Sequence, residues 1–222
     1  MLGTNKILKA ENHKGHELNV QEIFPTVQGE GPYVGRPAVF VRLGGCNLAC
    51  DFCDTEFDSY RRMTLERILN EVENLANNSS KKLVRKLVVI TGGEPLRQPI
   101  ERLCEELLRK GFLVQIETNG TIFRQLPSEV MIVCSPKVTN GKYHAIRPDL
   151  LPRINAFKFI ISANRQEYSN VAYDLVQVPI YIQPMDEGDA IKNQKNLQLV
   201  LQLVESCGYL LSLQIHKIIG IK

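Results

Sequence analysis

Short apolar segments rich in β-branched residues recur along the chain, and segments with helical periodicity separate them. Each apolar segment is four to six residues long, which suits a buried strand better than a helix. Strands that alternate with helices predict an α/β fold with mostly parallel strands and right-handed crossovers. The expected strands are residues 38–43, 87–91, 113–117, 131–134, 157–161, 179–183 and 211–215.

Three segments have the periodicity of amphipathic helices. We expect Thr64 to cap the start of the first, and Gly111 and Gly208 to follow the ends of the other two. One face of each helix should pack on the sheet. The residues expected on these faces are Leu65, Ile68, Leu69, Val72 and Leu75, then Ile100, Leu103, Cys104, Leu107 and Leu108, then Leu197, Val200, Leu201 and Val204.

The length and composition indicate one globular domain, residues 1–222, in which residues 1–18 form a loose N-terminal arm or a short edge strand. The formal net charge of +3 is too small to indicate a nucleic acid or membrane partner. The sequence has no apolar run long enough for a membrane span, and its polar start lacks the apolar region of a signal peptide. We therefore expect a cytoplasmic protein.

Three of the six cysteines lie in one loop directly after the strand predicted at residues 38–43. Cys46, Cys50 and Cys53 have the spacing C-x-x-x-C-x-x-C. Three thiolates on a short loop can bind three corners of a [4Fe–4S] cluster, because such clusters take soft sulfur ligands. The fourth iron then stays open for a cofactor or substrate.

Structural zinc or a redox dithiol is the alternative interpretation of this loop. Zinc usually takes four protein ligands, and no fourth cysteine or histidine lies nearby in the sequence. The remaining cysteines lie on an apolar helix face, at the end of an apolar strand and at the end of a helix. We expect Cys104, Cys134 and Cys207 to have ordinary structural roles.

Other unusual segments also follow predicted strands: residues 92–95, 118–120, 135–137, 183–186 and 216–217. The carboxyl ends of parallel strands meet at one edge of a sheet, where α/β proteins bind their ligands. One site could therefore collect all of these segments and the cysteine loop. In Gly92-Gly93-Glu94-Pro95, the glycines let the backbone approach a ligand, and Glu94 can accept a hydrogen bond from an ammonium group.

The cysteine spacing, the aromatic Phe52 between the last two cysteines and the Gly-Gly-Glu-Pro segment together resemble the radical S-adenosylmethionine (SAM) superfamily. This resemblance implies a partial (β/α) barrel with its site at the carboxyl ends of the strands. It also implies a [4Fe–4S] cluster whose open iron is chelated by SAM.

A narrower resemblance rests on Phe24-Pro-Thr-Val-Gln-Gly-Glu-Gly31 and on the tail Gln214-Ile-His-Lys-Ile-Ile-Gly-Ile-Lys222. From about Asn19 onward the chain is similar to the 7-carboxy-7-deazaguanine synthases of queuosine biosynthesis. The resemblance implies a lyase that contracts 6-carboxy-5,6,7,8-tetrahydropterin to 7-carboxy-7-deazaguanine and ammonia. A radical derived from SAM would take hydrogen from C6 of the pterin and later return it. The resemblance further implies magnesium, a flavodoxin- or ferredoxin-type reductant and a homodimer.

The same resemblance assigns site residues, none of them a catalytic acid or base, because the radical forms on the cofactor. Thr55 would bind magnesium. Arg42 suits the substrate carboxylate, because a guanidinium pairs with a carboxylate through two hydrogen bonds. Lys222 would bind the pterin through its main-chain carboxylate. The cofactor site would comprise Phe52, Cys53, Asp54, Gly93, Ser135, Pro136, Lys137, Gln183, Pro184, Met185 and Asp186; the substrate site Val27, Gln28, Gly29, Glu30, Arg42, Thr91, His216 and Lys222.

Two other functions share part of the pattern. A glycyl-radical-activating enzyme would have the cysteine loop but act on a protein partner, and it would not predict the segment at residues 24–31 or the His216 tail. An iron–sulfur electron carrier would require a fourth cysteine and would not need the Gly-Gly-Glu-Pro segment after a strand.

Overall fold

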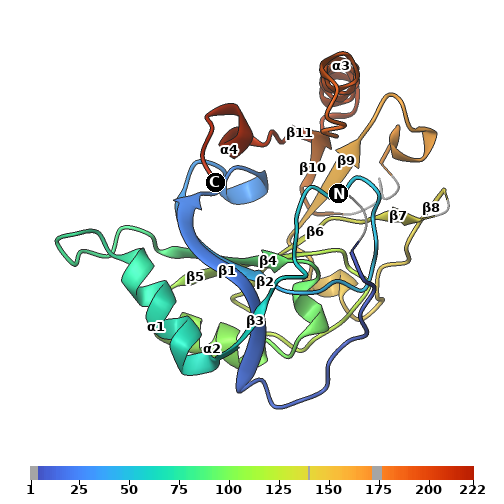
Figure 1. The fold of residues 1–222 in the computed structure, drawn as a ribbon. Helices are drawn as coiled ribbons and strands as arrows, with labels where there is room; N and C mark the ends of the chain where they lie inside the picture. Colours follow the sequence, from blue (N-terminus) through green and yellow to red (C-terminus); the bar gives the residue numbers. More distant parts are fainter. Residues whose placement is uncertain (1–4, 140, 172–176) are drawn as a thin grey trace.

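The computed structural model describes residues 5–139, 141–171 and 177–222, and most of its strands form one sheet (Figure 1). Within these residues the sheet has nine strands in the order β11-β10-β9-β6-β5-β4-β2-β1-β3, and β7 pairs with β8 in a separate hairpin. The strands are β1 Glu17–Val27, β2 Pro37–Leu43, β3 Arg61–Thr64, β4 Leu87–Gly92, β5 Leu113–Thr118, β6 Met131–Cys134, β7 Val138–Thr139, β8 Lys142–Tyr143, β9 Ala156–Ile161, β10 Ile180–Pro184 and β11 Leu210–Leu211.

The strands from β2 to β11 in the large sheet pair in parallel, whereas β1 pairs antiparallel with both β2 and β3. Six of the seven strands expected from the sequence form within one residue of the predicted ends. Most of their apolar side chains are buried, as expected for parallel strands covered by helices. The sheet is mostly parallel and open, which fits the partial barrel.

The prediction of a strand at residues 211–215 is wrong. β11 contains only Leu210 and Leu211, which are exposed, and a short helix, α4 Ile215–Ile218, follows it. The chain leaves the sheet at Ser212, which is buried. Its hydroxyl donates to Oε1 of Gln183 at 3.0 Å and accepts from the backbone N–H of Gly31 at 3.2 Å. These bonds turn the chain toward the carboxyl ends of the strands.

The sequence analysis missed β1, which is the longest strand. Its apolar alternation is interrupted between Val20 and Glu22, where the register with β2 shifts. It also contains Pro25, which normally argues against a central strand. Pro25 is tolerated because only the first four residues of β1 pair with β3, so Pro25 has a strand on one side only.

The part of the chain that the structure describes has four α-helices beside the sheet: α1 Leu65–Ala76, α2 Glu101–Arg109, α3 Ala190–Cys207 and α4. α1 and α2 lie side by side, and α3 lies over β10 and β11 at the other end of the sheet (Figure 1). The Thr64 cap and the two helix-ending glycines are confirmed. Leu201 of α3 is exposed, against expectation, because Asn196 occupies the buried face and donates to the backbone oxygen of Met185 at 2.9 Å.

The N-terminal segment runs along the cysteine loop. The backbone N–H of Leu8 donates to the carbonyl of Cys46 at 2.7 Å, and Glu11 pairs with the buried Arg97 at 2.8 Å. Residues 17 and 18, expected in a loose arm or a short edge strand, belong to β1. None of the helices in the described residues is both long and apolar enough to span a membrane.

Candidate active site

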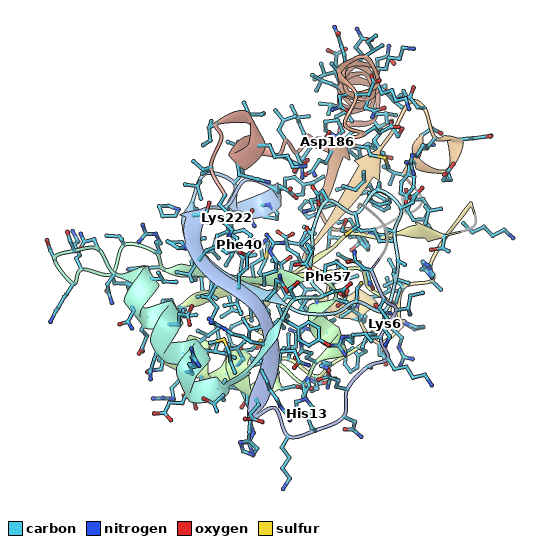
Figure 2. All side chains as sticks on the ribbon, viewed as in Figure 1. Lys6, His13, Phe40, Phe57, Asp186 and Lys222 are labelled. Atoms are coloured by element: carbon cyan, nitrogen blue, oxygen red, sulfur yellow. The ribbon has the colours of Figure 1, made fainter. Side chains whose placement is uncertain are left out.

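A cavity of about 430 Å³ opens at the carboxyl ends of the parallel strands. The labelled residues Phe40, Phe57, Asp186 and Lys222 line it, with Asp186 near the base of α3 and Lys222 near the end of β1 (Figure 2). Of the residues predicted for the site, those that line the cavity are Val27, Gln28, Glu30, Arg42, Cys46, Cys50, Phe52, Cys53, Asp54, Thr55, Thr91, Gly93, Ser135, Lys137, Gln183, Pro184, Met185, Asp186, His216 and Lys222.

Gly29 and Pro136 do not line this cavity. Gly29 lies against the C-terminal tail instead: a Cβ atom at this position would be 2.3 Å from Nδ1 of His216 and 3.1 Å from its backbone nitrogen. The carbonyl of Gly29 accepts from the backbone N–H of Ile215 at 3.2 Å. The absence of a side chain therefore allows the tail to pack here, and the glycine contributes to the site through His216.

The three cysteines of the loop all line the cavity, with Cys46 buried and the other two half-buried. Burial raises the pKa of Cys46 to about 12 and also raises the pKa values of Cys50 and Cys53. Binding of iron would therefore displace protons from all three thiols.

The arrangement of these thiols fits a cluster better than a single ion. In the described part of the chain, no three His, Cys, Asp or Glu side chains converge closely enough to hold one metal ion. A [4Fe–4S] cluster binds each thiolate at a different iron, so its ligands stand further apart than those of a mononuclear zinc. The donor set of three cysteines thus suits a cubane with one open iron.

The backbone of the Gly-Gly-Glu-Pro segment contacts the start of the cysteine loop. The N–H groups of Gly93 and Glu94 donate to the carbonyls of Leu43 and Gly45 at 3.1 and 3.0 Å. This close approach positions Cys46 relative to the end of β4.

Glu94 does not face an ammonium group, the role that its sequence position suggested. It is fully buried, it does not line the cavity, and both carboxylate oxygens are occupied. Oε1 accepts from the backbone of Leu96 and the hydroxyl of Thr118, and Oε2 accepts from the backbone of Asn119 at 2.7 Å. Burial raises the pKa of Glu94. Glu94 therefore holds the loops after β4 and β5 together instead of facing an ammonium group.

Lys137 places a half-buried positive charge beside the cysteines. Its ammonium donates to the backbone oxygen and hydroxyl of Ser135 at 2.9 and 2.6 Å. Burial lowers its pKa, while the nearby Cys50 thiol acts in the opposite direction. A cation at this position suits a negatively charged cluster or the carboxylate of a ligand.

A second lysine, Lys158, lines the same cavity and is buried. Lys158 of β9 is 6% exposed, and its ammonium contacts Glu30 and, at 3.2 Å, Glu117 of β5. Gln28 donates to the same Glu117 carboxylate at 3.0 Å. Burial would raise the pKa of Glu30, but the Lys158 charge holds it below its usual range.

Arg42 lies near the end of β2, opposite Glu22 of β1. Its Nε donates to Glu22 at 2.8 Å, and its Nη1 is 3.4 Å from the hydroxyl of Thr55. The Lys222 ammonium also contacts Glu22 and lies 4.7 Å from the ring centre of Phe24. The side chain of Lys222 is therefore engaged, whereas the sequence analysis considered only its main chain.

The main chain of the C-terminal tail is also held at this wall. The hydroxyl of Thr26 donates to the backbone oxygen of Lys222. Earlier in the tail, Gln214 donates to Glu30 at 3.1 Å. The Lys217 ammonium lies 2.7 Å from Asp54 and 3.0 Å from Asp186. The tail thus contacts segments assigned to substrate and segments assigned to cofactor.

The sequence analysis gave no role to Glu117, Lys158, Gln214 or Lys217, although all four line the cavity. For Lys158 the sequence does contain an indication of a role. This residue interrupts the apolar segment of β9, where a buried charge without a partner would be costly. The others become recognisable only when their partners are known.

The chain is similar to several known proteins. The Radical SAM superfamily matches residues 40–135 of the chain. Over its whole length the chain is 52% identical to the 7-carboxy-7-deazaguanine synthase of Rickettsia prowazekii (strain Madrid E), of which it covers 96%. It is 38% identical to the enzyme of that name from Rhodospirillum rubrum, with both chains fully covered.

The fold is similar to that of a solved structure, the crystal structure of QueE from Escherichia coli. The TM-score is 0.72 at 25% sequence identity, and the match covers 89% of this chain and 93% of the other.

Proposed function

Since the chain belongs to the 7-carboxy-7-deazaguanine synthase family within the radical SAM superfamily, we propose that it contracts the ring of 6-carboxy-5,6,7,8-tetrahydropterin. The products are 7-carboxy-7-deazaguanine and ammonia. The enzyme is a radical SAM carbon–nitrogen lyase that uses a [4Fe–4S] cluster and SAM, and it acts in 7-deazapurine (queuosine) biosynthesis.

The observation that carries the proposal is that one cavity collects the three cysteines and the polar segments after several strands. Cys46, Cys50 and Cys53 would hold three irons, and the bound cluster supplies the electron that generates a radical from SAM. The segments at residues 135–137 and 183–186 lie beside the cysteines and would bind SAM. The Lys137 cation suits the SAM carboxylate.

The part of the cavity between β1, β5 and the tail would bind the pterin. Gln28 and Glu30 present an amide and a carboxylate there, and an aminopyrimidine edge needs both donors and acceptors. Arg42 would bind the substrate carboxylate. Thr91 and His216 line the same cavity and complete this part of the proposal.

Resemblance to the family also supports further partners. We propose that Mg²⁺ binds near Thr55 and the substrate, keeping most of its coordination sites for water and substrate oxygens. A flavodoxin- or ferredoxin-type protein would supply electrons. The enzyme would work in the cytoplasm as a homodimer.

The test is an anaerobic reaction of the reconstituted protein with SAM, dithionite and the carboxypterin, analysed by mass spectrometry. We expect 7-carboxy-7-deazaguanine, with SAM retained at the end of the reaction. Absence of this product from protein that carries the cluster and binds SAM would disprove the substrate assignment.

Two reactions separate the other functions. With SAM and dithionite but no carboxypterin, a radical SAM enzyme would release some 5′-deoxyadenosine, whereas an electron carrier would release none. With the carboxypterin added, a glycyl-radical-activating enzyme would leave the pterin unchanged.

A further inference from the structure

Lys217 of α4 joins the tail to two separate segments of the cavity wall. Its ammonium lies 2.7 Å from Oδ2 of Asp54 and 3.0 Å from Oδ2 of Asp186. Asp54 directly follows the last cluster cysteine, and Asp186 ends the segment after β10. One side chain thus connects three parts of the chain that are far apart in the sequence.

The two aspartates differ in how far they depend on the tail. Oδ1 of Asp186 accepts from the backbone N–H of Gly188 at 3.1 Å and from Asn193 of α3 at 2.9 Å, so this carboxylate is held without the tail. Asp54 accepts from the hydroxyl of Thr55 at 3.2 Å and from Gln214 of the tail at 3.3 Å. The position of Asp54 therefore depends in part on the tail.

The tail itself has little apolar packing to hold it. Ile218 and Ile219 of this segment are 69% and 56% exposed, and α4 has only four residues. A helix this short has no stability of its own. Polar contacts hold it in place instead. Among the described residues, the two ion pairs of Lys217 are the only ion pairs that join the tail to Asp54 and Asp186.

The tail carries His216 and Lys222 on the substrate side, while Asp54 and Asp186 belong to the proposed SAM side. We call the tail closed when Lys217 is bound to Asp54 and Asp186. A ligand that fixes these two aspartates favours the closed tail, and the closed tail in turn favours the fixed position of the aspartates. Two ligands that each bind the closed arrangement better must then strengthen each other's binding.

We propose that Lys217 is a positioning residue that couples SAM binding to pterin binding by fastening the tail to Asp54 and Asp186. This inference rests on the proposed function for the identity of the two ligands. Lys217 itself needs to touch neither of them. Its effect reaches the pterin through His216 and Lys222.

The test uses three variants of the reconstituted protein. Lys217→Met keeps the length of the side chain but removes its charge, and Lys217→Arg keeps the charge. Lys195→Met removes an exposed lysine charge from α3 and serves as the matched control. Calorimetry measures the Kd of 6-carboxypterin, an analogue that lacks the hydrogen at C6, with and without SAM.

We expect SAM to tighten 6-carboxypterin binding about tenfold in the parent protein, within the usual range of coupling between sites. In Lys217→Met the factor should fall below about twofold, whereas Lys217→Arg should retain most of it and Lys195→Met all of it. An unchanged factor in Lys217→Met, or no coupling in the parent, would overturn the proposal.

Hydrogen exchange supplies a readout that does not depend on the pterin. SAM should slow amide exchange across residues 215–221 in the parent and in Lys195→Met but not in Lys217→Met. Equal protection in parent and Lys217→Met would also overturn the proposal. A parent protein that binds no pterin but shows the SAM-dependent protection would contradict only the proposed substrate, so the two failures are distinguishable.

Discussion

A Cβ atom at Gly93 would lie 2.1 Å from the backbone oxygen of Gly45, a distance at which one of the two segments must move. Gly93 follows β4, and Gly45 immediately precedes Cys46, the first cysteine of the loop. The segment at residues 92–95 and the cysteine loop are thus fitted together backbone to backbone, and the glycine is needed for this contact as well as for any approach of a ligand.

We predict that Gly93→Ala displaces the cysteine loop. Overpacking at a tight contact costs about 1–3 kcal/mol, and here the displaced atoms adjoin Cys46. Iron content per chain should therefore fall more than overall stability does, as measured by iron analysis beside thermal unfolding. The control is Gly208→Asn at the end of α3, where a Cβ would meet open space. Full iron content in Gly93→Ala would show that the loop can adapt.

The cysteine assignment predicts a sharp division between two sets of variants. Cys50→Ala should lose the cluster, because Cys50 lines the cavity with the two other ligands. Cys207→Ala, which changes an exposed cysteine at the end of α3, should keep about four irons per chain. Visible absorption and iron analysis after anaerobic purification measure both. Loss of iron in Cys207→Ala would mean that the ligand set is different.

Lys158→Met should give the enzyme an altered dependence of stability on pH. The variant leaves Glu30 and Glu117 without their buried cation, and breaking a buried pair costs about 3–5 kcal/mol. In the parent, Lys158 lowers the pKa of Glu30, so this contribution is present above the usual pKa of a glutamate and is lost only on acidification.

In the variant the pKa of Glu30 should instead be raised, because burial acts without the opposing Lys158 charge. Protonation of Glu30 then removes the cost of a buried, unpaired charge as the pH falls. We expect the difference in free energy of unfolding between parent and Lys158→Met to be larger at pH 8 than at pH 6, measured by urea unfolding under anaerobic conditions. Lys195→Met is the control for loss of one positive charge. A difference that grows on acidification would contradict the prediction.

The sequence predicted the parallel part of the sheet well, because strands buried on both faces are continuous apolar segments. It failed where local pattern and tertiary context disagree. Residues 211–215 are apolar enough for a strand, but Ser212 bonds to Gln183 and Gly31 and turns the chain away. A short apolar run does not by itself distinguish a strand from a helix.

The part of the site that could be predicted consists of the residues that follow the carboxyl ends of the strands. Residues that follow parallel strands must meet at one edge, so the cavity lining could be assembled from segments of the sequence. Contacts between side chains could not be predicted in this way. Lys217 has no local feature that points to Asp54 and Asp186, and Glu94 resembles a ligand-binding carboxylate until its three internal donors are known.

Thr55 provides a specific test of the magnesium proposal. Its hydroxyl lines the cavity, 3.2 Å from Asp54 and 3.4 Å from Arg42. Thr55→Ala should reduce the stimulation of turnover by Mg²⁺ severalfold while iron content and SAM binding stay unchanged, because a neutral hydroxyl is one weak ligand among several. Thr55→Ser, which restores the hydroxyl, should recover the response. An equal response in Thr55→Ala and the parent would exclude this residue.

The last prediction concerns Arg42, whose guanidinium is already held on one side. Its Nε donates to Glu22, which fixes the plane of the group and leaves the Nη atoms at the cavity wall. A fixed plane is what a two-bond pairing with the substrate carboxylate requires, and a lysine cannot reproduce it. We therefore expect Arg42→Lys to raise the KM for the carboxypterin about tenfold, with iron content and SAM affinity unchanged.

Glu22→Gln separates this role from a purely structural ion pair. The variant keeps a hydrogen-bond acceptor for Nε but weakens its hold, so KM should rise by a smaller factor than in Arg42→Lys. If Arg42 merely paired with Glu22, the two variants would lose stability alike and leave KM unchanged. Steady-state kinetics beside thermal unfolding distinguishes the two cases, and an unaltered KM in Arg42→Lys would remove Arg42 from the substrate site.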